Sequence, residues 1–152
     1  MRVRLLLLST VLFFGCPSTP PSRAEPKDAG PAQIVLWDVL QLRAPLDARA
    51  NSRPDRLELI LRPETRSPST LTLQRCTQEE DAALRREATA NVGPLAYRLE
   101  RHEGGSGGAE ASLLGAYTLG KQSWKVECHV QSEFPLPAGD WCLPYLLTLE
   151  PR

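Results

Sequence analysis

The 152-residue chain has little of the side-chain chemistry that enzymes and nucleic-acid-binding proteins use. It holds two histidines and one methionine, aromatic residues make up 6% of it, and its formal net charge is zero. Without a basic excess there is no electrostatic reason to expect binding to nucleic acid. Two histidines, with no acidic pair in an apolar context, supply no acid–base set. We therefore predict a non-enzymatic protein without a cofactor, a metal or a nucleic-acid partner.

The first residues do have a distinct character, which is typical of an export signal. Arg2 and Arg4 are followed by an uncharged apolar run over residues 5–14, which is too short to cross a hydrocarbon core of ~30 Å as a helix. No later run is long and apolar enough to span a membrane. We expect residues 1–15 to be a signal peptide.

The end of this run, Leu12-Phe13-Phe14-Gly15-Cys16, resembles a bacterial lipobox. The resemblance implies that Cys16 is diacylated through its sulfur and becomes the new N-terminus. Two or more acyl chains give stable anchoring in a membrane. The alternative is cleavage after the small-x-small sequence Ser22-Arg23-Ala24, with release of the protein.

Residues 16–31 combine the lipidated cysteine with a proline-rich stretch that lacks apolar bulk. Such a composition cannot build a packed core, and proline favours an extended chain with ~3.1 Å per residue. We expect a disordered tether that holds a domain of residues 32–152 away from a membrane of the bacterial cell envelope. Pro17 is not the aspartate that retains lipoproteins in the inner membrane, which favours the outer membrane. A secreted or periplasmic protein is the alternative.

Alternating apolar residues predict short β-strands in this domain. Residues 33–42 carry apolar side chains on both parities, which indicates a strand covered on both faces, a bulged strand or a short buried helix. Residues 43–54 read as a loop. Further strands are predicted in residues 57–61, 71–76, 95–100, 112–119, 124–130 and 141–149.

One short helix interrupts the strands. Thr77-Gln-Glu-Glu80 has the pattern of a capping box, in which the threonine hydroxyl and the glutamate side chain close the first helical turn. Asp81 and Arg85 form an i,i+4 pair. The helix is predicted to end near Ala88, before Gly93 and Pro94.

About seven short strands separated by turns favour an all-β fold, a β-sandwich rather than a barrel. The chain resembles bacterial immunoglobulin-like exported domains in Leu57-Glu-Leu-Ile-Leu-Arg62, Thr70-Leu-Thr-Leu-Gln-Arg-Cys76, Tyr97-Arg-Leu-Glu-Arg101 and Leu136-Pro-Ala-Gly-Asp-Trp141. The resemblance implies an immunoglobulin-like antiparallel β-sandwich of about seven strands with one short helix. It implies little about chemistry, since function resides in sites rather than in folds.

Three cysteines remain in the predicted domain: Cys76, Cys128 and Cys142. An exported protein meets an oxidising compartment, so one disulfide is expected, and three pairings are possible. The resemblance implies a bond between Cys76 and Cys128. Strand alternation also places Cys142 opposite Trp141 and Leu143, which makes Cys142 the candidate free thiol.

No residue set predicts catalysis or metal binding. Cys128 and His129 are adjacent, but alternation points them to opposite faces of a strand, whereas a metal needs three or four converging ligands. Ser106 lacks the flanking pattern of a nucleophile elbow, and the acidic residues 79–81 suit the start of a helix.

Two functions therefore compete. The first is a lipid-anchored envelope protein whose sandwich binds another envelope protein or has a structural role. The alternative is a periplasmic module that binds a small ligand or a metal, for which Cys128-His129 and the aromatic residues Trp37, Trp124, Trp141 and Tyr145 are the only indications. These aromatic residues lie on strand patterns and are expected in the core.

Overall fold

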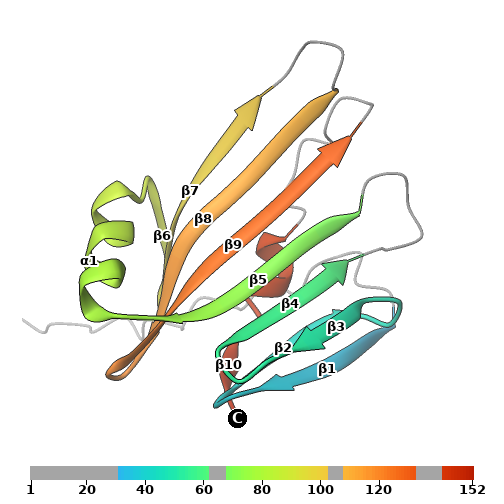
Figure 1. Ribbon diagram of the computed structural model, residues 1–152, viewed down its shortest axis with the longest axis horizontal. Helices are drawn as coiled ribbons and strands as arrows, with labels where there is room; N and C mark the ends of the chain where they lie inside the picture. The colour runs from blue at the N-terminus through green and yellow to red at the C-terminus, as the bar shows by residue number, and fades with distance from the viewer. Residues whose placement is uncertain (1–30, 62–67, 103–107, 133–141) are drawn as a thin grey trace, which may run out of the picture.

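The computed structural model describes residues 31–61, 68–102, 108–132 and 142–152, which form two antiparallel β-sheets (Figure 1). The larger sheet has seven strands in the order β3-β4-β5-β9-β8-β7-β6, and the smaller has three in the order β1-β2-β10. The predicted all-β class is confirmed. The larger sheet comprises β3 (Arg49–Ser52), β4 (Arg56–Leu61), β5 (Ser69–Cys76), β6 (Ala90–Val92), β7 (Leu95–His102), β8 (Ala109–Leu119) and β9 (Gln122–Ser132). The smaller comprises β1 (Ala32–Trp37), β2 (Leu40–Pro45) and β10 (Glu150–Pro151).

The predicted alternation is clearest in β4 and β9 of the larger sheet. Every second residue of β4 is buried, and so is every second residue of β9 from Trp124 to Val130. The cross-strand register places Leu71 beside Cys128 and Leu113 in one row, so the buried side chains of neighbouring strands share a face. That face and the inner face of the smaller sheet enclose the main core, whose largest fully buried side chains are Trp124, Leu40, Leu42, Leu57, Leu59, Leu61, Leu71, Leu73, Leu95, Leu113, Leu146 and Val126.

Helix α1 (Gln78–Glu87) begins as the sequence predicts. The Thr77 hydroxyl accepts the Glu80 N–H at 3.2 Å, and the Glu80 carboxylate accepts the Thr77 N–H at 2.7 Å, which completes the capping box. Arg85 pairs with Asp81 and donates to the carbonyl of Pro94. The helix lies at one end of β7, β8 and β9 (Figure 1). No residue of α1 is buried, in keeping with its alanine-rich apolar side.

The sequence predicts one strand or one short helix over residues 33–42. The structure instead forms a hairpin there. β1 and β2 are joined by a two-residue turn at Asp38 and Val39, and Asp38 adopts φ 55°. Asp is one of the few residues besides Gly that tolerate this conformation, so it permits a tight turn. The following segment is not wholly a loop either, because β3 lies within it.

The C-terminal apolar run is not the long strand that its alternation predicts. Residues Leu143–Leu146 form the single-turn helix α2, and only Glu150–Pro151 enter a sheet. Pro144 explains the difference, since proline cannot donate to a strand ladder but suits the first turn of a helix. Leu143, Leu146 and Leu149 are then buried at a spacing of three residues.

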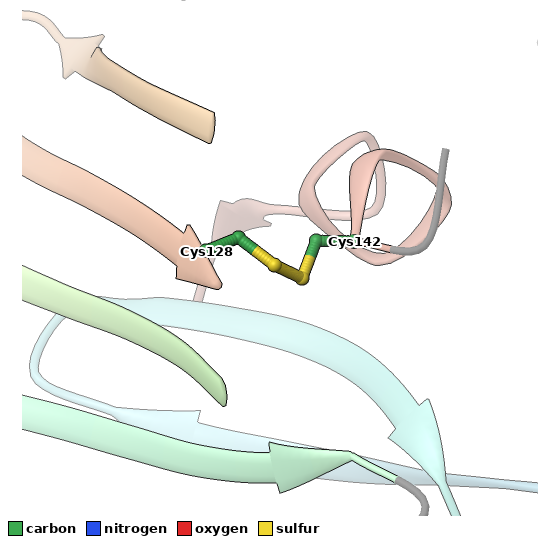
Figure 2. The surroundings of a disulfide bond; sticks show 2 residues. All are labelled: Cys128 and Cys142. Atoms are coloured by element: carbon green, nitrogen blue, oxygen red, sulfur yellow. A yellow bond between two sulfur atoms is a disulfide. The ribbon is translucent and has the colours of Figure 1, made fainter. Parts of the chain in front are cut away.

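The predicted cysteine pairing is wrong. The structure joins Cys128 to Cys142 (Figure 2), with 6.3 Å between their Cα atoms, and leaves Cys76 as a free thiol. Cys76 lies beside Ser123 in the β5–β9 ladder, whereas Cys128 lies beside Leu71. Five residues of strand separate the two rows by about 17 Å, and a disulfide needs Cα atoms within about 7 Å. Strand alternation predicted a free thiol at Cys142, but alternation does not apply there, because Cys142 is the N-cap residue of the helix α2.

Candidate functional site

Exposed apolar side chains concentrate in the first hairpin of the structure. Among the described residues, the large apolar side chains with the greatest exposure are Ile34 (65%), Leu46 (58%) and Leu36 (50%), and Val39 in the turn is also exposed. Ile34 and Leu36 alternate on β1 and share its outer face, whereas Val35 and Trp37 face the core. Single exposed apolar residues are ordinary, but a group on one strand marks an interaction surface.

β1 also forms an unprotected edge of the smaller sheet. In the described part of the chain, it pairs with β2 alone. Natural edge strands are usually short, charged, bulged or interrupted by proline, because an open row of backbone donors and acceptors recruits other strands. β1 is six residues long, and its sequence, AQIVLW, contains no charge and no proline. We refer to β1 and its outward residues Ile34 and Leu36 as the β1 edge.

Two side chains of β1 tie this edge to the larger sheet. Gln33 Nε2 donates to the carbonyl of Ala48 at 3.0 Å, just before β3, and Trp37 Nε1 donates to the carbonyl of Arg53 at 2.8 Å, just after β3. Trp37 is also buried in the core. These bonds hold β1 at both of its ends, so the edge is presented in a fixed position.

The turn after β1 is anchored by an ion pair. Arg75 of β5 donates through Nε and Nη2 to the two carboxylate oxygens of Asp38, at 2.8 and 2.5 Å. Trp124 Nε1 lies 3.4 Å from Asp38 Oδ2. The hydrogen bond and charge of Arg75 lower the pKa of Asp38 below its usual value of 3.8, although desolvation opposes this shift. Asp38 therefore stays ionised and bonded to Arg75 across the physiological range.

Arginines without an ion pair in the described structure lie near the β1 edge. Arg43 of β2 is exposed and stands directly beside Ile34 in the β1–β2 register. Beyond the β3 strand, a shallow pocket of about 140 Å³ is lined by Asn51, Arg53, Arg56 and Glu58. Of these arginines, Arg43 lies nearest to the exposed apolar residues of β1, since it pairs with Ile34.

The sequence-predicted candidates do not assemble into a chemical site. Cys128 is 1% exposed and bonded to Cys142, while His129 points to the outer face, where it lies 3.5 Å from Glu110. The disulfide removes the cysteine as a metal ligand. Within the described ranges, no group of three His, Cys, Asp or Glu residues could hold a metal ion.

The remaining predicted residues divide between the core, the surface and the part of the chain outside the description. Trp37 and Trp124 are buried, as predicted, and Tyr145 packs against the core. Cys76 is half-buried, and burial, followed by the charges of Asp81 and Glu80, raises the pKa of its thiol. The signal peptide 1–15, the tether as far as residue 30 with Cys16, Ser106 and Trp141 lie outside the described residues. In the described part, no helix has the length and apolar character to cross a membrane.

Sequence reasoning missed the β1 edge, although its signal was visible. Residues 33–42 are apolar on both parities, a pattern that predicts a strand covered on both faces, a bulged strand or a short buried helix. The structure buries one parity of β1 and exposes the other. An apolar residue that alternation cannot place in the core is the signal that indicates an interaction surface.

Comparison with known proteins gives one family match. The model of the type six secretion immunity 3 domain, Tsi3, matches residues 41–150, which leaves β1 outside the matched region. No curated protein matches the chain. A crystal structure of a protein from Bacteroides thetaiotaomicron VPI-5482 is similar in fold, with a TM-score of 0.50 and 14% sequence identity. The match covers 82% of this chain and 49% of that one, so the chain spans about half the length of its structural neighbour.

Proposed function

This chain belongs to the type six secretion immunity 3 domain family, Tsi3, and on that premise we propose that it is an immunity protein. It binds a toxic effector delivered by a type six secretion system and blocks that effector by occupying its surface. The family match over residues 41–150 carries the proposal. A binding protein needs no catalytic residues of its own, which agrees with the non-enzymatic reading of the sequence.

The proposed site of action is the cell envelope. The export signal of residues 1–15, lipidation at Cys16 and the tether of residues 16–31 would place the domain 32–152 beside a membrane, facing an arriving effector. The first described strand begins at Ala32, next to the proposed end of the tether. An outer-membrane anchor and an immunoglobulin-like relationship remain predictions from the sequence.

A growth assay tests the immunity function. Each type six effector of the producing bacterium is expressed with an export signal in a test bacterium, alone or together with the full-length chain. We expect the chain to restore growth against one of these effectors and to have no effect on the others. Failure to restore growth against any of them would overturn the proposal.

The anchor is tested separately. Labelled palmitate should enter the full-length protein, and Cys16→Ser should abolish both the label and pelleting with membranes. Pelleting that persists in Cys16→Ser would reject the lipid anchor and leave the immunity function standing. The variant also shows in the growth assay whether protection requires attachment.

A further inference from the structure

We propose that an extended segment of the effector joins the smaller sheet as an additional strand along the β1 edge. Its apolar side chains cover Ile34 and Leu36, and a carboxylate of the segment faces Arg43. This inference rests on the immunity function proposed above. It goes beyond the family match, because β1 lies outside the residues that the family model covers.

The backbone of β1 is oriented for such an addition. In a hairpin with a two-residue turn, the residues that flank the turn exchange hydrogen bonds, and every second pair along the ladder does the same. Trp37 and Leu40 flank the turn, and the bond from Leu46 N–H to the Pro31 carbonyl at 3.2 Å confirms this parity at the other end. The backbone groups of Ile34 and Leu36 therefore point away from β2, toward the open edge.

The side chains on the outer face specify what the added strand should carry. Ile34 and Leu36 are two residues apart on one face and at least half exposed. An added strand places alternate side chains over that face, so apolar residues at every second position would cover both. Main-chain hydrogen bonds then provide much of the affinity, and these apolar contacts provide the specificity.

Charge favours an effector segment over a second copy of this chain. Arg43 is exposed beside Ile34 and has no ion pair in the described structure. If a second copy paired through its own β1, the added strand would have the sequence AQIVLW, which contains no carboxylate. A segment with an acidic residue beside its apolar positions satisfies both the apolar face and Arg43, and charge complementarity at an interface favours the correct partner.

The test measures binding of the full-length chain, in detergent, to the effector that the growth assay identifies. Ile34→Lys and Leu36→Lys place a charge on the outer face, and Leu36→Pro removes an outward N–H without removing a β1–β2 bond. Arg43→Ala removes the proposed charge partner. Ile60→Lys is the matched control, because Ile60 is an exposed isoleucine on β4 in the other sheet. Thermal unfolding identifies variants that fail to fold.

We expect the lysine variants and Leu36→Pro to weaken binding by about tenfold or more and to lose growth protection, with a smaller loss for Arg43→Ala. Ile60→Lys should bind like the wild type. Folded β1 variants that bind and protect normally would overturn the inference and leave the immunity function intact. Equal weakening by Ile60→Lys would also overturn it, as would a dimer of the chain alone that Ile34→Lys converts to a monomer.

Discussion

The two sheets of this protein are held together by different means. The larger sheet has long ladders, in which β8 and β9 pair over eleven residues each and β5 and β7 continue the pairing on either side. The smaller sheet has one hairpin of six residue pairs and two further pairs with β10. Because backbone pairing contributes less there, the smaller sheet depends on individual side chains that attach it to the larger one.

Their edges differ as well. The larger sheet ends in β3, with the polar sequence RANS, and in the three-residue strand β6. The smaller ends in β10, which contains Pro151, and in β1, which has six residues and neither a charge nor a proline. Among the described residues, three of these four edges carry the usual protection against strand addition, and one does not. The difference indicates that the larger sheet is the scaffold and that β1 is the binding element.

Of the side chains that attach the smaller sheet to the larger one, Trp37 should contribute most to stability. Trp37→Ala removes a buried ring and the bond to Arg53, so we expect the free energy of unfolding to fall by about 3–5 kcal/mol. Trp37→Phe keeps most of the packing and should cost about 1 kcal/mol through the lost hydrogen bond. Urea unfolding measures both.

Hydrogen exchange shows where the Trp37→Ala effect is located. The amides of β1 and β2 should lose protection before those of β8 and β9, because the longer ladders hold on their own. Uniform loss of protection in both sheets would contradict the distinction between them.

The disulfide is the second attachment, because it ties α2, which precedes β10, to β9. Its sequence separation is 14 residues, and a loop of that size corresponds to about 3 kcal/mol of stabilisation. Cys142→Ser should lower the free energy of unfolding by about this amount, while Cys76→Ser, the matched control, should have little effect. Denaturation under oxidising conditions measures the difference.

Chemical labelling checks the same assignment. Non-reducing peptide mapping should recover Cys128 linked to Cys142. The raised pKa of Cys76 keeps its thiol protonated at neutral pH, so alkylation of the folded protein should be slow and should accelerate only in alkaline solution. A peptide that links Cys76 to either other cysteine would refute the pairing.

The ion pair of Asp38 should give the smallest effect and a characteristic pH dependence. Its folded-state pKa is lowered, so its contribution is present above the usual value of 3.8 and is lost as the pH falls through the lower folded-state pKa. Asp38→Asn tolerates the same backbone conformation, so the variant keeps the turn but removes the charge and one of the two oxygens that accept hydrogen bonds from Arg75. We expect a modestly lower melting temperature at pH 7, and a difference from wild type that shrinks in acid.

Asp47→Asn provides the control for this measurement, since Asp47 is an exposed aspartate. It should leave the melting temperature nearly unchanged at both pH values. A difference between Asp38→Asn and wild type that grows toward low pH would contradict the role assigned to Arg75.

Local patterns in the sequence predicted much of the larger sheet. Alternation located β4, β5, β7, β8 and β9, and the capping pattern at Thr77 located α1 within about one residue of its observed end. These features depend on residues close together in the chain. The same reasoning failed for residues 141–149, where Pro144 and a burial spacing of three residues outweigh alternation.

The sequence by itself determined the all-β class and the helix, because side-chain periodicity and capping patterns act locally. Only the tertiary structure decided which cysteines meet, because a disulfide depends on the register between β5 and β9 and on the position of α2. It also decided that Ile34 and Leu36 are exposed. Whether an apolar strand is covered on one face or on both depends on how many layers pack around it, and no local pattern carries that information.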